Sequence, residues 1–251
     1  MGDEDVAAYS DKNVVITGGG AGMGFALAKL LVDGGARVVI TGRSQATLDA
    51  ARDLGENAVA VQGDVASLSD LDALADRVKG ELGSIEALFV NAGIVGSTPF
   101  ESTTEEVFDE MIAINVKGAF FTVQKLAPLL STGAGVVLTT SAANVIGMLD
   151  TSVYAAGKAA LRSMARTFSR EMLPRGIRVN AVSPGPIDTG ILEKVMTEEA
   201  AEQFTAQVLA DNPMQRFGTP DEFARAAAFL AFEATYTTGA EFTVDGGRTQ
   251  L

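Results

Sequence analysis

The chain has 251 residues, 47% of them hydrophobic and 20% charged, and its formal net charge is −13 at pH 7. This composition predicts a sizeable buried core. The acidic charge argues against nucleic acid or an anionic membrane as a partner, because phosphate groups require a basic surface, although it is also an ordinary solubility feature. Without Cys or His, disulfides, cysteine metal sites and a Ser-His-Asp triad are excluded, so acid–base chemistry must come from Tyr, Lys, Asp or Glu. We assign no metal site.

We expect a cytoplasmic protein with a single domain over residues 1–251. The first residues lack the basic and apolar regions of a secretory signal. No stretch reaches the roughly 18 continuous apolar residues that a membrane-spanning helix requires. No segment resembles a linker or repeats another.

Strands and helices are predicted to alternate along the chain. The first strand, 13–17, a glycine cluster, a helix from Phe25 and a second strand, 37–41, make one βαβ unit. The remaining strands are predicted at 58–61, 85–90, 135–140, 177–182 and 241–244. Helices are predicted at 45–54, 68–82, 104–130, 152–172 and 221–232, with an interrupted helical pattern at 188–211. Because most strands are nearly continuous in apolar residues, we predict an α/β fold: a Rossmann-type doubly wound parallel sheet of about seven strands with helices on both faces.

The glycine cluster predicts a dinucleotide site. Its spacing is Thr17-Gly18-x-x-x-Gly22-x-Gly24, with Met23 between the last two glycines. Glycines here let the backbone turn tightly and let a pyrophosphate approach the helix N-terminus, where free N–H groups favour an anion. Any tight strand–helix turn can use glycine, but its position in the first βαβ unit favours a nucleotide.

The end of the second strand favours NADP(H) over NAD(H). An NAD site usually places an acidic residue about 20 residues beyond the glycine motif to hold the ribose 2′-hydroxyl. Arg43 and Ser44 lie there instead, and both could bind a 2′-phosphate. The alternative is an ordinary surface arginine, which leaves NAD(H) possible.

Other cofactor-binding candidates follow later strands, because an open parallel sheet binds ligands at the carboxyl ends of its strands. Asp64 could accept a hydrogen bond from the adenine amino group, and small residues after the fourth strand would permit close contact with ribose. These candidates are Asp64, Val65, Asn91, Ala92 and Gly93.

Tyr154 and Lys158 are the strongest catalytic candidates. Their i, i+4 spacing puts both side chains on one face of a helix. We expect the neighbouring ammonium to lower the pKa of the phenol from about 10, which would make the hydroxyl a usable proton donor and acceptor. Ser141, at a strand end, could hydrogen-bond the same substrate oxygen. The chain has only three tyrosines, and the other two lie near its ends.

Taken together, these motifs resemble the short-chain dehydrogenase/reductase family, and the chain looks closest to bacterial ketone reductases and 3-oxoacyl-carrier-protein reductases. The resemblance covers essentially the whole chain, through Val244-Asp-Gly-Gly247. Its motifs are Thr17-Gly-x-x-x-Gly-x-Gly24, Asn91-Ala-Gly93, Asn115, Ser141, Tyr154-x-x-x-Lys158 and Pro184-Gly185.

The resemblance implies a role for each of these positions. Tyr154 would be the acid–base residue, and Lys158 would lower its pKa and hold the nicotinamide ribose. Ser141 would position the substrate carbonyl, and Asn115 would hold a water that relays protons. The nicotinamide would lie along Pro184, Gly185, Ile187 and Thr189. Residues 188–211 would form a substrate lid. Ala21 stands where many NADP-preferring members carry a basic residue.

Homo-oligomerisation is a further expectation, because the helical regions 118–130 and 152–172 are apolar on more than one side. A large central core would explain the same pattern. The resemblance implies a tetramer.

The sequence therefore predicts NADP(H)-dependent, reversible reduction of ketones and aldehydes to alcohols. The predicted substrate residues are Val95, Asn144, Met148, Leu192 and Met196. They are mostly apolar and carry no positive charge, which favours a hydrophobic ketone, although lid residues could instead face solvent or one another. Two alternatives remain: reduction of 3-oxoacyl groups on the acidic acyl carrier protein, and a non-catalytic NADP-sensing protein.

Overall fold

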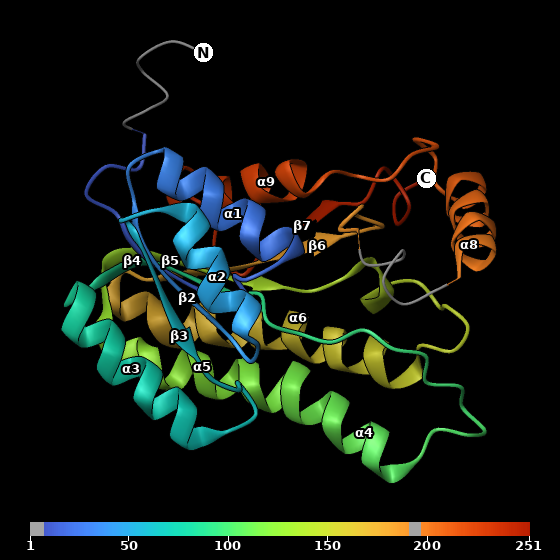
Figure 1. Ribbon diagram of the computed structural model, residues 1–251, viewed down its shortest axis with the longest axis horizontal. Coiled ribbons are helices and arrows are strands. Elements are labelled where there is room, and N and C mark those ends of the chain that lie inside the picture. The colour runs from blue at the N-terminus through green and yellow to red at the C-terminus, as the bar shows by residue number, and fades with distance from the viewer. Residues whose placement is uncertain (1–7, 191–196) are drawn as a thin grey trace.

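The computed structural model describes residues 8–190 and 197–251. Its seven parallel strands form one sheet in the order β3-β2-β1-β4-β5-β6-β7 (Figure 1). The strands are β1 (Asn13–Thr17), β2 (Arg37–Gly42), β3 (Ala58–Gln62), β4 (Ile85–Val90), β5 (Leu130–Thr139), β6 (Arg178–Pro184) and β7 (Glu241–Val244). The predicted fold class is confirmed.

Helices cover both faces of the sheet (Figure 1). The helices are α1 (Gly22–Asp33), α2 (Gln45–Leu54), α3 (Leu68–Leu82), α4 (Glu105–Ile112), α5 (Ala119–Leu126), α6 (Ser152–Met172), α8 (Glu198–Asp211) and α9 (Pro220–Phe232). One hydrophobic cluster packs α1, α2 and α9 against the sheet, and a second packs α3, α5 and α6 against its other face.

The strands are apolar on both sides because both of their faces are covered. In β1, Val15 belongs to the cluster beneath α3, α5 and α6, whereas Val14 and Ile16 belong to the cluster beneath α1 and α9. Successive strand residues point to opposite faces, so a buried central strand needs an unbroken apolar run. This explains why the central strands were predictable from hydrophobic runs alone.

The region predicted as one helix over 104–130 is divided. A π-helical segment, Ala113–Gly118, separates α4 from α5, and a short 3₁₀ turn with Pro128 ends the helical region. The strand β5 then begins at Leu130 rather than at 135. Its first residue pairs with Ile85, and the register shifts before Gly135 pairs with Ala87. Proline lacks the N–H that a longer helix would need, so the helix could not continue as predicted.

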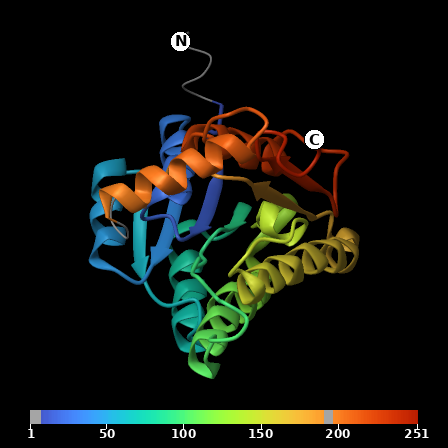
Figure 2. The ribbon, with the colours of Figure 1, turned by 90° about the vertical axis from the view of Figure 1, so that its right-hand side faces the viewer.

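The strand order reverses between β1 and β4. From β1 the sheet grows outward through β2 to β3 on one side, and from β4 through β5, β6 and β7 on the other. The connections leave in opposite directions here, which opens a crevice at the carboxyl ends of these two strands. In Figure 2, the helix α8 lies across this edge of the sheet.

Within the described ranges 8–190 and 197–251, no helix is both long and apolar enough to cross a membrane.

Arg178 joins the sheet to the end of α9 and generates a stability prediction. Its guanidinium donates to the carbonyl oxygens of Leu230 (2.8 Å), Ala231 (2.5 Å) and Ala234 (3.0 Å). Leu230 and Ala231 are in the last turn of α9, where carbonyl groups lack helical partners, and Ala234 lies just beyond the helix. We expect Arg178→Met to lower the free energy of unfolding by about 2–4 kcal/mol, because several charge-assisted bonds are lost. Arg225→Met, at an exposed position on α9, should change it by less than about 0.5 kcal/mol in the same urea titration. Equal losses in both variants would contradict this prediction.

Candidate active site

The glycine turn is built around close backbone contacts. Gly18 has φ +68°, and a Cβ there would lie 2.9 Å from the Cα of Ala92. A Cβ at Gly24 would lie within 3 Å of the Gly18 carbonyl and of the Asn91 amide nitrogen. Neither position has room for a side chain. The turn can therefore lie directly against the end of β4.

Thr17 fastens this turn to β4. Its Oγ1 accepts hydrogen bonds from the backbone N–H groups of Asn91 and Ala92, both at 3.0 Å. The side-chain amide of Asn91 donates in turn to the Gly18 carbonyl at 3.3 Å. Asn91 and Ala92 thus lie at the end of β4, directly beside the glycine turn.

The N-terminus of α1 is suited to an anion. Ala21 precedes the helix in an extended conformation and makes no side-chain cap, and the first turn carries no acidic residue. Gly22 and Met23 are the first two residues of the helix. Because the first N–H groups of a helix have no helical partner, this end can bind a pyrophosphate. The donors and the small residues therefore fit the phosphates of a dinucleotide.

The end of the crevice that was predicted to bind adenosine is formed by the residues after β2 and β3. Arg43 is half exposed, and its nearest charged partner is Asp64, with 4.0 Å between Nη1 and Oδ2. Ser44 is the N-cap of α2 but makes no side-chain cap, so Arg43 lies beside a second helix N-terminus with free donors. Asp64 accepts a hydrogen bond from Ala66 N–H at 2.9 Å. Val65 is buried against Gly118 rather than open to the crevice.

Asn115 lies in the π-helical segment and is buried against the loop after β4. Its Oδ1 accepts from the backbone N–H of Ile94 at 2.8 Å, and its Nδ2 donates to the Ile94 carbonyl at 2.9 Å. A Cβ at Gly93 would lie 3.0 Å from the Asn115 Oδ1 and 3.5 Å from the Lys158 Nζ. Gly93, Asn115 and Lys158 are therefore packed together. π-helical turns are frequent at functional sites.

Ser141 and Tyr154 meet at the carboxyl end of β5. Ser141 directly follows Thr140 and begins a short 3₁₀ turn, where its Oγ accepts from Ala143 N–H at 3.2 Å. Tyr154 is the third residue of α6, and the Ser141 side chain lies near enough to its hydroxyl to influence the pKa of the phenol. The predicted pair of hydroxyl groups is thus brought together from two separate elements.

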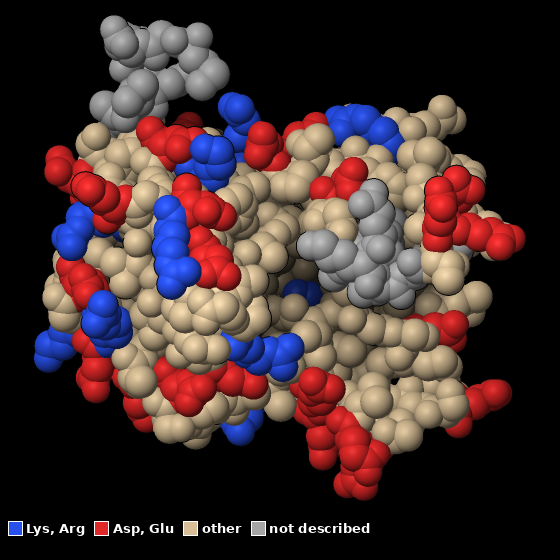
Figure 3. Space-filling model, viewed as in Figure 1, with Lys and Arg blue, Asp and Glu red and all other residues tan. Residues whose placement is uncertain are grey.

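Lys158 lies one helical turn beyond Tyr154 and is the only buried Lys or Arg that the structure describes. Its ammonium donates to the Thr139 carbonyl at 2.9 Å and lies 5.7 Å from the centre of the Tyr154 ring. Burial lowers the pKa of Lys158 from its ordinary value to about 8. Figure 3 shows a hollow in this face beside the glycine-turn end of α1, with blue atoms of a basic residue inside it.

The expected lowering of the Tyr154 pKa is wrong for the free protein. Burial is the largest influence and raises the pKa of the phenol, while the hydrogen bond with Ser141 opposes it. Desolvation disfavours the charged phenolate, and Lys158 faces the ring from 5.7 Å rather than contacting the hydroxyl. In the free protein Tyr154 therefore keeps its proton at neutral pH.

The segment from Pro184 to Thr189 borders the crevice. Gly185 donates its N–H to the Val244 carbonyl at 3.0 Å, and Ile187 bridges to Gly218. A Cβ on Gly22 would lie 3.3 Å from the side chain of Thr189, so Thr189 lies over the glycine turn. The segment predicted to lie along the nicotinamide therefore passes beside the glycine turn.

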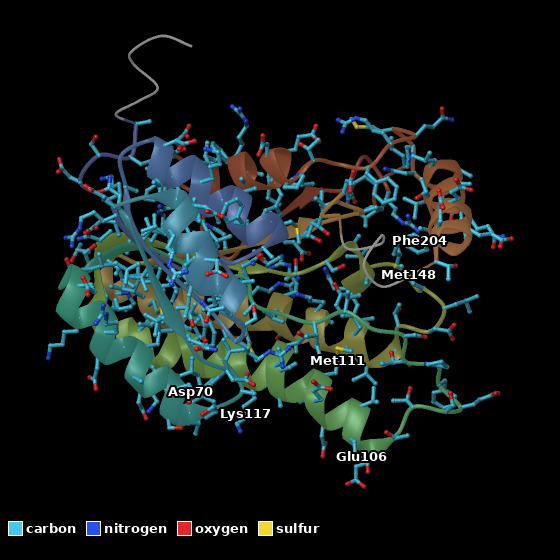
Figure 4. The ribbon with its side chains drawn as sticks, in the orientation of Figure 1. Asp70, Glu106, Met111, Lys117, Met148 and Phe204 are labelled. Atoms are coloured by element: carbon cyan, nitrogen blue, oxygen red, sulfur yellow. The ribbon has the colours of Figure 1, made fainter. Side chains whose placement is uncertain are left out.

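The predicted substrate residues are only partly described. Val95 and Met148 are exposed apolar side chains, whereas Asn144 is half-buried and donates its amide to the Ser141 carbonyl at 2.6 Å. Met148 and Phe204 of α8 lie at the same end of the molecule (Figure 4). Leu192 and Met196 lie outside the described residues, as does part of the predicted lid at 188–211. The loop after β4 and the loop before α6 are joined where Thr98 pairs with Thr151.

Two contributions were missed at the sequence level. Thr17 belongs to the glycine motif, but the motif does not predict its hydrogen bonds to the backbone after β4. Thr139 lies in a predicted strand with no predicted role of its own, yet its carbonyl accepts from the Lys158 ammonium and its hydroxyl donates to Asn91 Oδ1 at 3.3 Å. The sequence signal for these roles was position: Thr17 directly precedes Gly18, and Thr139 directly precedes the pair Thr140-Ser141.

Comparison with known proteins shows the family of the chain. The family model described as enoyl-(acyl carrier protein) reductase matches residues 18–249. Oxidoreductase asL5 of Sarocladium schorii is 42% identical over 98% of this chain and 99% of its own length. The chain belongs to the short-chain dehydrogenase/reductase family.

Two further proteins are similar to this chain over nearly its whole length. 2-(S)-hydroxypropyl-CoM dehydrogenase 3 of Xanthobacter autotrophicus is 33% identical over 95% of this chain and 96% of its own. The crystal structure of a short-chain dehydrogenase/reductase from Brucella melitensis, described as a glucose/ribitol dehydrogenase, has a TM-score of 0.90 at 30% identity. It covers 97% of this chain and 99% of that chain. The protein is an oxidoreductase that interconverts alcohols and carbonyl compounds with a nicotinamide cofactor.

Burial of Lys158 predicts a pH-dependent cost to stability. Its pKa falls from 10.5 in the unfolded chain to about 8 in the folded one, which corresponds to roughly 3 kcal/mol of destabilisation when the amine is charged in both states. Between these two values the unfolded chain binds the extra proton, so the stability contributed by this group rises with pH.

We therefore expect Lys158→Met to be more stable than the wild type at pH 7, with this advantage falling to about half at pH 9.5. Urea unfolding of both proteins across this range measures it. Lys117→Met, at an exposed position, provides the matched control and should show no such trend. An advantage that stays constant from pH 7 to pH 9.5 would contradict the lowered pKa.

Proposed function

We propose that this enzyme reduces neutral, largely apolar ketones and aldehydes with NADPH, and catalyses the reverse oxidation with NADP⁺. The observation that carries the proposal is the grouping of the Ser141 and Tyr154 hydroxyls and the Lys158 ammonium beside the glycine turn. The nearby turn fits a dinucleotide pyrophosphate, and the hydroxyls fit a single carbonyl oxygen.

The roles of the side chains follow from their chemistry. A bound nicotinamide cofactor supplies the hydride. Tyr154 donates its proton to the carbonyl oxygen as negative charge develops there, and Ser141 donates a hydrogen bond to the same oxygen. The raised pKa of Tyr154 keeps the proton on the phenol until it is needed. The charge of Lys158 then stabilises the phenolate, which takes up a proton from solvent.

The preference for NADP(H) rests on Arg43 and Ser44. The Arg43 side chain is 52% exposed, and its charged partner among the described residues, Asp64, lies 4.0 Å away, so its guanidinium is open to a phosphate. The uncapped N-terminus of α2 adds backbone donors at the same place. Together they suit the 2′-phosphate, which is an additional double charge that the NAD ribose lacks.

The substrate class rests on the side chains around the crevice. Val95, Val145, Met148 and Leu149 are exposed and apolar, and none of these positions supplies a positive charge. Such a surface offers no partner for a carboxylate or phosphate on the substrate. The net charge of −13 would likewise repel an acidic carrier protein. A free neutral ketone therefore suits the site better than an acyl carrier.

Tyr154→Phe tests the chemistry. This variant should bind NADPH with nearly unchanged affinity but lose at least about 100-fold in kcat, because the proton donor is gone while the fold is kept. The experiment follows nicotinamide absorbance with a panel of neutral ketones. Tyr236→Phe, at a fully exposed position, is the matched control and should retain wild-type kcat. Turnover by Tyr154→Phe at the wild-type rate would remove the mechanism.

Arg43→Ala tests the cofactor. We expect KM for NADPH to rise about 10- to 100-fold with little change in KM for NADH, because a charge-assisted contact to the 2′-phosphate is lost. Arg52→Ala, also exposed but at the last turn of α2, should leave both constants unchanged. Parallel changes in both KM values on Arg43→Ala would show that the arginine does not discriminate between the cofactors.

A further inference from the structure

Glu241 is an acidic residue of the sheet whose side chain is largely buried. It is the first residue of β7, pairs in register with Ala181 of β6, and its side chain is only 11% exposed. Removing a carboxylate from water is costly unless charged or hydrogen-bonding partners replace the solvent. The partners of Glu241 therefore indicate what this position does.

Both carboxylate oxygens of Glu241 are engaged. Oε1 accepts hydrogen bonds from the Thr140 hydroxyl at 2.7 Å and from the Asn144 amide at 3.0 Å. Oε2 lies 3.2 Å from Nε of Arg162, whose side chain is 19% exposed. Arg162 also donates to the Gly239 carbonyl at 3.0 Å, just before β7 begins. The carboxylate is thus a junction between β7, α6 and the turn after β5.

The residues that Glu241 contacts in the turn after β5 lie on either side of Ser141 in the sequence. Thr140 directly precedes it, and Asn144 follows three residues later and donates the same amide group to the Ser141 carbonyl at 2.6 Å. The backbone of Thr140 is tied to β6 through its N–H bond to the Val182 carbonyl at 2.9 Å. Both ends of the short turn that carries the Ser141 hydroxyl are therefore held by one carboxylate.

The ion pair of Glu241 with Arg162 contacts α6, the helix that carries Tyr154 and Lys158. Arg162 lies one turn after Lys158 and two turns after Tyr154 on α6. The ion pair with Glu241 therefore joins the helix that carries Tyr154 to the turn that carries Ser141. Catalytic hydroxyls must be held within a fraction of an ångström, and such supporting contacts are what hold them.

We propose that Glu241 is a positioning residue that holds Ser141 in hydrogen-bond register with Tyr154, acting through Thr140 and Asn144. This inference rests on the proposed function, in which both hydroxyls bind one carbonyl oxygen. The competing explanation is a purely structural ion pair that fastens β7 to α6 and has no specific effect on Ser141.

A double-mutant cycle separates the two. If Glu241 acts through Ser141, Glu241→Ala should lower kcat about tenfold in the wild type but less than about twofold in a Ser141→Ala background. Thermal unfolding of each variant confirms that it is folded at the assay temperature. The same loss in both backgrounds, or no loss in the wild type, would overturn the proposal.

Glu86→Ala is the matched control. Glu86 is also a half-buried strand glutamate that accepts two hydrogen bonds, from Asn13 N–H at 2.8 Å and Ser131 Oγ at 3.2 Å. It lies near the amino end of β4, whereas Ser141 and Tyr154 lie at the carboxyl ends of the strands. We expect Glu86→Ala to lower the unfolding temperature without changing kcat. A kcat loss equal to that of Glu241→Ala would show that any buried glutamate has this effect, and would overturn the proposal.

Two double variants distinguish the role of Glu241 as a hydrogen-bond acceptor from its role in the ion pair with Arg162. Glu241→Gln combined with Arg162→Met keeps an oxygen for Thr140 and Asn144 and removes the guanidinium that would otherwise be left unpaired. Its kcat should return to within about threefold of the wild type, whereas Glu241→Ala with Arg162→Met should stay low. Equal kcat in these two double variants would assign the effect to the ion pair and overturn the proposal.

A readout without turnover separates failure of this inference from failure of the proposed function. With ¹³Cζ-labelled tyrosine the chain gives three signals, and Tyr154→Phe assigns the relevant one. At pH 7.5, Glu241→Ala and Ser141→Ala should shift the Tyr154 signal in the same direction, and the combination no further. A signal that responds to Ser141→Ala but not to Glu241→Ala would overturn the positioning role, even in a protein that reduces no ketone tested.

Discussion

The buried ammonium of Lys158 is the constraint on which the rest of the site depends. A lysine amine is normally solvated, yet here it lies inside the fold and donates to the Thr139 carbonyl at the end of β5. Gly93 packs beside it: a Cβ there would lie at an ordinary contact distance of 3.5 Å from Nζ, but only 3.0 Å from Oδ1 of Asn115. Fixing this amine also fixes the first turns of α6 against β5, and with them the ring of Tyr154.

The parallel sheet explains why such distant segments meet. All strands end at the same edge, so the turn after β1, the loop after β4 and the turn after β5 are neighbours although 75 or more residues can separate them (Figure 2). The reversal of strand order between β1 and β4 opens the crevice at this edge, and Thr17 ties its two walls together. The strand order thus places the glycine turn and the turn that carries Ser141 at the same edge of the sheet.

Local patterns made much of the fold predictable. The strand at 85–90 and the helices at 45–54, 68–82 and 152–172 agree with the structure at both ends, because each has a clear hydrophobic pattern bounded by polar or glycine residues. The grouping of Tyr154 with Lys158 needed only helical spacing. Its proximity to Ser141 needed the additional rule that strand ends share one edge.

What sequence spacing could not supply was burial and long-range pairing. The pKa of Tyr154 was expected to fall because of a nearby charge, but its direction depends on how far the phenol is removed from water. The π-helical segment around Asn115 has no distinctive residue pattern, and it interrupts a region that appeared as one helix. Glu241 contacts residues about 80 to 100 positions earlier, and these contacts follow only from the place of β7 beside β6.

The most direct measurement is a crystal structure of the protein with NADP⁺ and an unreduced ketone, a pair that cannot react with each other. The account predicts that the pyrophosphate lies at the N-terminus of α1 and that the ketone oxygen lies about 2.6–3.2 Å from the hydroxyl oxygens of both Ser141 and Tyr154. A ketone bound elsewhere, a Tyr154 hydroxyl turned away from the crevice, or a dinucleotide that avoids the glycine turn would contradict it.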